Sequence, residues 1–166
     1  MKPTGLLVAL MLCVGWPAHA ADAAFLKSLA GNWVGGGTVK VDADSGQTKI
    51  NCKFVSQAVG SSISLDGRCT GYVVFSRVIS ADVRSNGKSY TGTYTGSSTG
   101  PAGLSGKRSG NALILGIHWA KSVNGDRLAQ LRLEKVGNNG MRLKTVDNDP
   151  ATGKTITISD INLRRS

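Results

Sequence analysis

Apolar and polar residues alternate with a period of two along most of this chain, and this pattern constrains the fold more than any other feature. Between Leu113 and Trp119 every odd position is apolar, and the alternation returns at Leu131–Leu133 and Met141–Leu143. Successive side chains of a β-strand point to opposite faces, so alternation of this length indicates strands with one buried face. Only 18% of residues are charged and Glu134 is the single glutamate, whereas exposed helix faces are usually rich in Glu and Lys. A mainly β fold is therefore expected.

Turn-forming residues separate the alternating segments at intervals of about 8–12 residues. Asn86-Gly87 and Asn124-Gly125 are pairs that tolerate the positive φ angles of two-residue hairpin turns. Even spacing favours a sandwich or an up-and-down barrel, and a meander of many strands closes into a barrel because closure removes its unpaired edges. We predict an all-β antiparallel meander barrel of about 8–10 strands. The segments predicted as strands are residues 33–42, 48–57, 62–70, 72–83, 88–96, 102–108, 112–119, 127–136, 141–147 and 155–164.

The first twenty residues have the composition of a bacterial export signal. Lys2 gives a positive start, an apolar run extends from Leu6 to Trp16, and Pro17–Ala20 supplies the small residues that a signal peptidase recognises. We expect cleavage after Ala20, which leaves residues 21–166 as a single domain in the periplasm or outside the cell. A leucine precedes Cys13, which fits a lipoprotein cleavage site poorly. No later segment has 18 consecutive apolar residues, so we do not expect an integral membrane protein.

Two cysteines, Cys52 and Cys69, remain after cleavage, and in an oxidising compartment they predict one disulfide. If they face each other in an antiparallel hairpin, the turn falls between Gly60 and Ser61, where turn-forming residues stand. The same register places Phe54 opposite Gly67. Directly opposite Cα atoms of paired strands lie about 4.5–5.5 Å apart, which is within disulfide reach. The bridge would close a loop of about 17 residues and contribute about 3 kcal/mol to stability.

The last predicted strand changes the parity of its apolar residues. Ile156 and Ile158 occupy even positions, whereas Ile161 and Leu163 occupy odd ones. A β-bulge at Ser159-Asp160 would restore a single buried face. The alternative is a strand that is apolar on both faces.

A short helix and a tryptophan motif stand at the start of the predicted domain. Phe25–Leu29 fits one helical turn or two, and Asp22 is the expected N-cap. Leu29–Trp33 then reads Leu-Ala-Gly-Asn-Trp, which resembles the Gly-x-Trp signature that opens lipocalins and other calycins.

The resemblance to calycins implies a way of closing the barrel. In that superfamily a short N-terminal helix plugs one end, and the signature tryptophan lies at the base. The resemblance places Gly31 and Trp33 at the base here, with a basic residue of the last strand across the indole, and Arg164 or Arg165 is the candidate. The chain as a whole also resembles small exported bacterial proteins of unknown function.

A second resemblance is to avidins, another group of calycins. Tyr90–Tyr94 reads Tyr-Thr-Gly-Thr-Tyr, which resembles the Thr-Gly-Thr-Tyr strand of avidins, and Leu115–Trp119 falls where a tryptophan-bearing strand would come. Avidins cage biotin with several tryptophans, whereas only Trp33 and Trp119 remain once the leader is removed. We therefore expect no biotin binding.

Residues that could support catalysis or metal binding are scarce. His118 is the one histidine outside the leader, and its parity is opposite to that of Trp119, which predicts a place on the surface or at the rim. Zinc sites need three or four ligands, and a Ser/His/Asp site would need a nucleophile elbow that is missing. Asp147–Asp149 lacks the bidentate glutamate of a calcium loop, and Gly35–Gly37 lacks the Lys-Ser/Thr of a phosphate loop. We expect no catalytic residue, metal or cofactor, and we expect Gly35–Gly37 to allow bulging or close packing.

The chain is basic, with 20 Lys and Arg against 10 Asp and Glu and a formal net charge of +10. Removal of the leader takes away Lys2 and no acid, which leaves +9. No basic block exceeds two residues, so the charge predicts a solvated surface or attraction to an anionic envelope component. Nucleic-acid binding needs dense basic stripes with stacking aromatics, and aromatics are only 5% here, so we expect none.

Two functions of different classes fit these residues. The first is a barrel that binds a small apolar or amphipathic ligand in a cavity of several hundred Å³. The candidate lining residues are Phe54, Phe75, Tyr90, Tyr94, Leu115 and Trp119. The alternative is a solid barrel with a structural or interaction role in the envelope, where its basic outer strands bind an anionic glycan, lipid or protein partner in a salt-sensitive way. An enzyme is not expected because general acid–base residues are few.

Overall fold

The computed structural model describes residues 18–40, 45–71, 75–149 and 152–166. The predicted export signal lies almost wholly outside these residues, so the leader and its cleavage stay predictions. The described elements are α1 (Ala18–Leu29), β1 (Gly31–Val39), β2 (Thr48–Val59), β3 (Ser62–Gly71), β4 (Phe75–Ser85), β5 (Tyr90–Thr95), β6 (Ala102–Ser109), β7 (Ala112–Val123), β8 (Asp126–Val136), β9 (Gly140–Asn148) and β10 (Thr155–Arg165).

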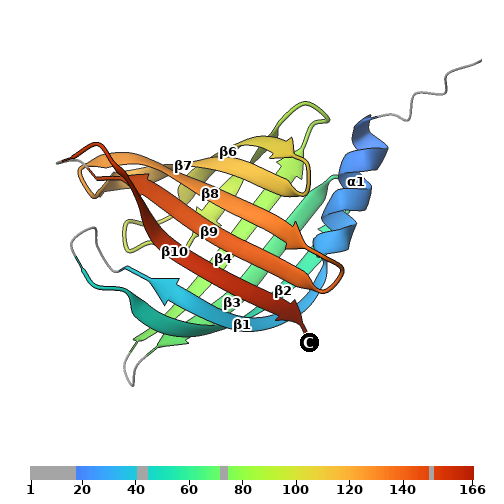
Figure 1. Ribbon diagram of the computed structural model, residues 1–166. Helices are drawn as coiled ribbons and strands as arrows, with labels where there is room; N and C mark the ends of the chain where they lie inside the picture. Colours follow the sequence, from blue (N-terminus) through green and yellow to red (C-terminus); the bar gives the residue numbers. More distant parts are fainter. Residues whose placement is uncertain (1–17, 41–44, 72–74, 150–151) are drawn as a thin grey trace, which may run out of the picture.

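The ten described strands form one closed antiparallel barrel (Figure 1). Each strand pairs with its neighbours in sequence, and β1 closes the ring by pairing with both β2 and β10. The predicted meander barrel is therefore confirmed. Tight turns that include Gly60, Gly110 and Gly137 join the strands at one end, and each of these glycines has a positive φ that other residues rarely adopt.

The period of two in the sequence is the alternation between the interior and the surface of the barrel. In β2, Ile50, Cys52, Phe54 and Ser56 are buried, whereas the residues between them are exposed. The same alternation holds in β7, where the odd positions from Leu113 to Trp119 point inward. These inward rows form the continuous hydrophobic core.

The glycines of β1 allow the first and last strands to pack closely. A Cβ atom at Gly35 or Gly37 would overlap the backbone of β10, at the carbonyls of Asn162 and Asp160. The prediction of close packing in this segment is confirmed.

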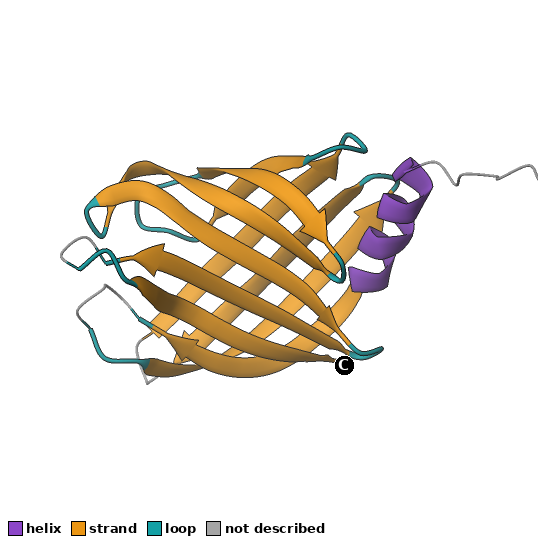
Figure 2. Cartoon of the chain, turned by 45° about the horizontal axis from the view of Figure 1, so that its top comes forward, coloured by secondary structure: helices purple, strands orange, loops and turns teal. Residues whose placement is uncertain are grey.

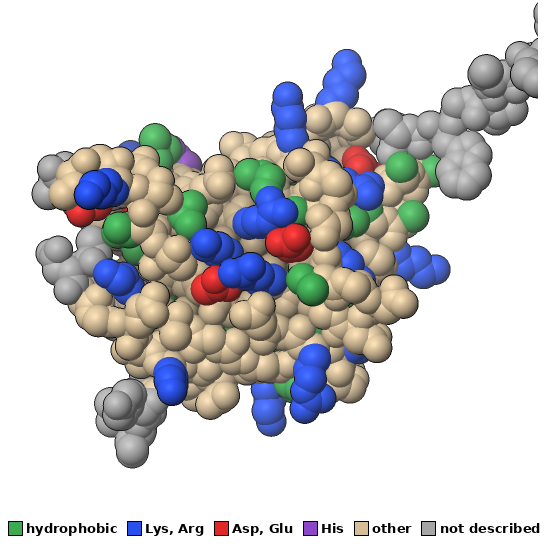
Figure 3. All heavy atoms as spheres, in the orientation of Figure 1, with side chains coloured by type: hydrophobic (Ala, Val, Ile, Leu, Met, Phe, Trp, Pro, Cys, Tyr) green, Lys and Arg blue, Asp and Glu red, His purple; other side chains and the backbone are tan. Residues whose placement is uncertain are grey.

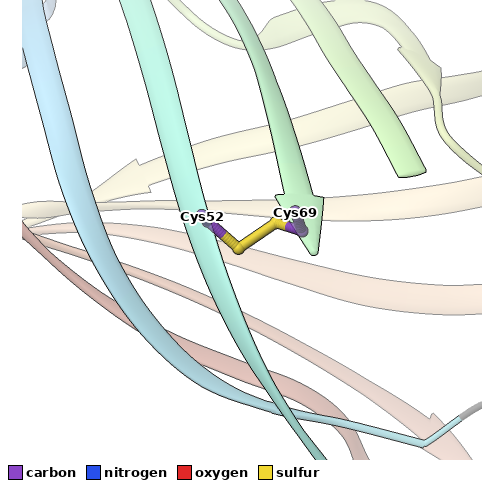
Figure 4. Close-up of a disulfide and its surroundings, with 2 residues drawn as sticks. All are labelled: Cys52 and Cys69. Carbon is purple, nitrogen blue, oxygen red and sulfur yellow. A yellow bond between two sulfur atoms is a disulfide. The ribbon is translucent and has the colours of Figure 1, made fainter. Parts of the chain in front are cut away.

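The disulfide and its register are as predicted. Cys52 and Cys69 are directly opposite in the β2–β3 pair, their Cα atoms are 4.1 Å apart, and their sulfur atoms are bonded (Figure 4). The same register places Phe54 opposite Gly67. A Cβ atom at Gly67 would overlap the Phe54 ring, so glycine at this position makes room for the aromatic side chain.

The helix α1 is longer than predicted and lies across one end of the barrel (Figure 2). The helix packs against β2 and β3, and its residues Leu26 and Leu29 are fully buried. The prediction of Asp22 as N-cap is wrong, because the helix begins four residues earlier and Asp22 instead accepts a hydrogen bond from the Ser85 hydroxyl. The carboxylate thereby ties the helix to the end of β4.

The predicted irregularity of the last strand is present. The pairing of β10 with β9 shifts between Thr157 and Ser159, next to the expected Ser159-Asp160. After the shift, Ile161 and Leu163 are buried, which gives β10 a single inward face. The alternative of a strand apolar on both faces is not needed.

Candidate functional site

The two ends of the barrel differ, and the end opposite α1 contains the candidate site. A hollow of about 200 Å³ lies there, lined by the last residues of β1, β3, β5 and β7, the end of β9, and the first residues of β2, β4 and β10. Its apolar walls include Ile50, Cys69, Ile79, Tyr94, Trp119 and Ile161. Because alternate strand ends meet at the same rim of a meander barrel, residues far apart in sequence come together here.

An aromatic pair forms one wall of the hollow. The rings of Tyr94 and Trp119 meet edge to face, with centroids 5.9 Å apart and an interplanar angle of 74°. Burial raises the pKa of the Tyr94 hydroxyl, and the nearby Arg77 opposes that rise in part. The phenol therefore stays protonated and can donate or accept a hydrogen bond at neutral pH.

Trp119 carries a buried donor with no acceptor. Its side chain is only 7% exposed, and within the part of the chain that the structure describes its Nε1 finds no hydrogen-bond partner. An indole N–H is a donor only, and a buried donor without a partner costs about 1–3 kcal/mol. An acceptor atom of a molecule in the hollow would satisfy this donor.

Arg77 places a cationic group on the inward side of the barrel. It lies opposite Cys69 in the β3–β4 pair, with the same parity as the inward-facing Ile79, and its Nη1 donates to the Gly96 carbonyl at 2.9 Å. Lys40 also lines the hollow. The hollow thus combines apolar walls with positively charged side chains and a tyrosine hydroxyl.

Among the five predicted lining residues whose side chains the structure describes, Tyr94 and Trp119 line the hollow. Phe54 and Leu115 face inward as expected but are packed within the core. Tyr90 lies at the opposite end, near α1, where burial and then Asp22 raise the pKa of its hydroxyl. The side chain of Phe75 is outside the described part of the structure.

The separation of the two tyrosines has a simple cause. Tyr90 and Tyr94 share the inward face of β5, as their parity predicts, but four residues of strand span about 13 Å. A strand of this length runs from one rim to the other, so one tyrosine belongs to each end. Parity alone therefore assigns a face and does not assign an end.

At the closed end, the tryptophan of the Gly-x-Trp motif is fully buried. Trp33 Nε1 donates to the Leu29 carbonyl and to the Ser56 hydroxyl, each at 3.0 Å. Gly31, with a φ of 140°, makes the junction between α1 and β1, and a Cβ atom there would overlap the Arg165 guanidinium. Both predicted positions, Gly31 and Trp33, thus lie at the base.

Of the two predicted candidates for the basic residue across this indole, Arg165 occupies the position and Arg164 does not. The Arg165 guanidinium carbon lies 4.5 Å from the Trp33 ring centroid, and its Nη1 and Nη2 donate to the carbonyls of Ala30 and Ser28 at 2.6 and 3.1 Å. Arg164 is exposed because β10 turns its odd residues inward after the bulge.

Other candidate chemistry is not assembled into a site. His118 is exposed on the outer surface of β7. The Asp147 carboxylate is buried, where it accepts hydrogen bonds from the Asn124 amide at 2.9 Å and from the Asn148 backbone. Among the described residues, no group of three or more His, Cys, Asp or Glu side chains is arranged to hold a metal ion. Within those same residues, no helix is both long and apolar enough to cross a membrane.

Sequence reasoning missed Arg77, Ile79 and the start of β10 as parts of the hollow. The sequence does carry a signal for them. Each has the parity of the inward face, and each stands near the rim where β1, β3, β5, β7 and β9 end. Larger hollows of about 430 and 470 Å³ lie on the outer surface, where strands rather than the barrel interior form their floor.

Comparison with known proteins bears on the fold. No protein-family model matches the sequence, and no curated protein matches it. The crystal structure of Rv2717c from M. tuberculosis aligns with a TM-score of 0.64 at 12% identity, over 91% of this chain and 98% of that chain. The structure of the S-type phycobiliprotein lyase CPES from Guillardia theta aligns with a TM-score of 0.58 at 9% identity, over 89% of this chain and 97% of that chain.

At these identities the likeness concerns the fold alone, which is a closed barrel of ten antiparallel strands. The resemblances to calycins, to lipocalins through Gly31 and Trp33 and to avidins through Tyr90–Tyr94, stay predictions.

Proposed function

We propose that this protein is an exported barrel that binds a small apolar or amphipathic ligand, without catalysis, in the hollow opposite α1. The observation that carries the proposal is the aromatic wall of Tyr94 and Trp119 around a space of about 200 Å³. Ligand sites are typically apolar hollows with a few polar groups that fix orientation. The hollow has this composition.

The size of the hollow limits the ligand. Sites for drug-sized molecules measure roughly 300–1,000 Å³, so a space of about 200 Å³ suits a smaller molecule or part of a larger one. The cavity volume expected from the sequence, several hundred Å³, is therefore larger than the hollow that the described residues line. A small ring or a short chain is the expected occupant.

The polar groups of the site favour an amphipathic ligand with a hydrogen-bond acceptor. The indole N–H of Trp119 has no acceptor among the described residues, Tyr94 is a protonated phenol, and Arg77 lines the same hollow. A carbonyl or carboxylate oxygen of the ligand would meet these donors while its apolar part contacts Ile79. Recovery of a hydrogen bond to a buried donor contributes about 1–3 kcal/mol to binding.

The proposal of a non-catalytic role rests on the residues that line the hollow. General acid–base chemistry needs a group that titrates near the working pH, and His118 points away from the interior. One structure with the same fold is that of a lyase, so the fold by itself is compatible with an enzyme. The composition of the hollow is what favours binding.

Export to the periplasm or beyond completes the proposal. Disulfides persist in oxidising compartments and are rare in the cytosol, and the Cys52–Cys69 bond is buried within the barrel wall. This bond is in keeping with the export signal expected over residues 1–20. Edman sequencing of the protein purified from its own host should give Ala21 as the first residue.

The first experiment is native mass spectrometry of the protein purified from its own host. Excess mass that disappears on denaturation is the expected result, and it gives the mass of the ligand directly. Ile79→Trp should abolish the excess mass, because the indole fills the hollow.

A matched pair of variants locates the site. Tyr94→Phe removes a hydroxyl at the proposed site, whereas Tyr90→Phe makes the same change on the same strand face at the opposite end. We expect reduced occupancy for Tyr94→Phe alone. Equal occupancy in both variants, or a bare mass for the wild-type protein, contradicts the proposal.

A further inference from the structure

A row of positive charge crosses the outer surface of the barrel on the side of β1 to β4. Strand register places Arg164 beside Val34, Val34 beside Lys53, Lys53 beside Arg68, and Arg68 beside Val78. All five side chains have outward parity, and the three cations are exposed. Since neighbouring strands are about 4.8 Å apart, Arg164 and Arg68 are separated by about 14 Å across the sheet.

Among the described residues, no acidic side chain forms an ion pair with this cationic row, although Asp66 lines the same outer groove as Lys53 and Arg68. Within the described chain none of Lys53, Arg68 and Arg164 takes part in an ion pair, and Arg68 donates only to the Ser76 hydroxyl, at 2.9 Å. Lys53 and Arg68 are directly opposed, and like charges in opposed cross-strand positions destabilise a sheet. The arrangement therefore works against folding stability and calls for a different explanation.

The neighbouring face of the same barrel shows the opposite arrangement. There Arg132 pairs with Glu134 at 3.0 Å, and Arg142 pairs with Asp160. Figure 3 shows acidic and basic side chains next to one another near the middle of that view, whereas the charged side chains along its lower edge are all basic. Pairing on one side and its absence on the other make the cationic row a local feature rather than a consequence of net charge.

Apolar side chains accompany the row. Val55 and Val78 are 47% and 57% exposed, and together with Val34 they border an outer groove of about 470 Å³ that Lys53 and Arg68 also line. Asp66 is the one acidic residue of the groove. An exposed apolar patch beside unpaired cations fits a partner that offers negative charge and apolar material together.

We propose that the cationic row and its valines form a docking surface for an anionic lipid bilayer. Lys53, Arg68 and Arg164 would contact the phosphate groups, while Val55 and Val78 would enter the headgroup region. A bilayer accounts for both parts of the surface, since a soluble anionic polymer would contact the cations and leave the valines in water. The proposal is independent of the cavity at the open end, because no residue lines both.

The test is partitioning of the mature protein onto vesicles of 30% phosphatidylglycerol in phosphatidylcholine, with pure phosphatidylcholine as reference. Each basic residue near an anionic membrane contributes roughly fivefold to partitioning, so Lys53→Gln, Arg68→Gln and Arg164→Gln together should weaken it by about 100-fold. The control replaces three exposed lysines elsewhere, Lys88, Lys107 and Lys121, by Gln. It removes the same net charge and should weaken partitioning by less than about fivefold.

A second pair of variants separates a bilayer from a soluble polyanion. Val55→Ser with Val78→Ser should weaken vesicle binding at least about threefold and leave binding to dextran sulfate unchanged. Circular dichroism and the urea midpoint establish that each variant is folded. The proposal is overturned if the wild-type protein does not prefer anionic vesicles, if both triple variants lose binding equally, or if the valine changes have no effect.

Discussion

Replacement of Arg165 by Ala should destabilise the barrel far more than replacement of its neighbour Arg164. The Arg165 guanidinium donates to the Ala30 carbonyl at 2.6 Å and the Ser28 carbonyl at 3.1 Å, and it lies over the Trp33 ring. Both carbonyls are at the C-terminal end of α1, where backbone acceptors lack helical partners. One side chain thus joins the last strand, the helix end and the first strand.

The magnitude follows from these contacts. Hydrogen bonds from a charged donor contribute about 1.5–3 kcal/mol each, and a partly exposed cation over an aromatic ring adds about 0.5–1 kcal/mol. Because Arg165 is partly exposed, the lower ends apply, and the free energy of unfolding should fall by about 3 kcal/mol. For a domain of this size that is a decrease in Tm of roughly 6–12 °C.

Guanidinium chloride unfolding, followed by tryptophan fluorescence, measures the effect. Arg164→Ala is the matched control, since Arg164 is exposed and a surface change of this kind alters stability by less than about 0.5 kcal/mol. Arg165→Lys keeps the charge but cannot donate to two carbonyls in fixed geometry, so an intermediate loss is expected. Equal losses for Arg164→Ala and Arg165→Ala would refute the assignment of the base residue.

Three further changes test the wall of the barrel. Joint replacement of Cys52 and Cys69 by Ala should lower the free energy of unfolding by about 3 kcal/mol, as measured by urea titration. The disulfide closes a loop with a sequence separation of 17, and without it the unfolded chain gains conformational entropy. Gly35→Ala should cost about 3 kcal/mol in the same assay, because its Cβ would overlap the backbone of β10 and force the strands apart. The Arg142 guanidinium lowers the pKa of Asp160, so the stability from this pair is complete above about pH 4 and is lost as pH falls through the lowered pKa. Asp160→Asn should therefore destabilise the protein at pH 7 and reduce the acid dependence of Tm below pH 4, as scanning calorimetry would show.

The fold was predictable from the sequence because its main determinants are local. Each of the signals used concerns a single strand or a single hairpin: strand parity, turn residues, and the spacing of Cys52 and Cys69. In a meander, each strand pairs with its neighbours in sequence, so these local signals are enough to predict the barrel. The β10 bulge was predictable for the same reason, since a change of parity is visible within a single strand. Even the helix was correctly placed, although its start and the role of Asp22 depend on a contact with Ser85, 63 residues away.

The candidate site was predictable only in part because it depends on position along the barrel axis. Tyr90 and Tyr94 have the same parity and nearly the same sequence context, yet one lies under α1 and the other in the open hollow. Arg164 and Arg165 differ by one residue, and the shift in β10 register decides which of them faces Trp33. The rim to which a residue belongs and the exact register at a bulge both follow from pairing across the whole ring.

The two tryptophans outside the leader differ in the hydrogen bonding of their indole N–H groups. At the closed end, Trp33 Nε1 and the Nη1 and Nη2 atoms of Arg165 reach acceptors, and Arg108 joins α1 through the Ala21 carbonyl at 3.1 Å, whereas the buried Tyr90 hydroxyl has no partner among the described residues. At the open end, Trp119 keeps a buried N–H without an acceptor among the described residues. The indole N–H of Trp33 thus has two acceptors, whereas that of Trp119 has none among the described residues. The proposed ligand would supply the missing acceptor, so a Trp119→Phe variant should lose affinity for it while retaining the stability of the empty barrel.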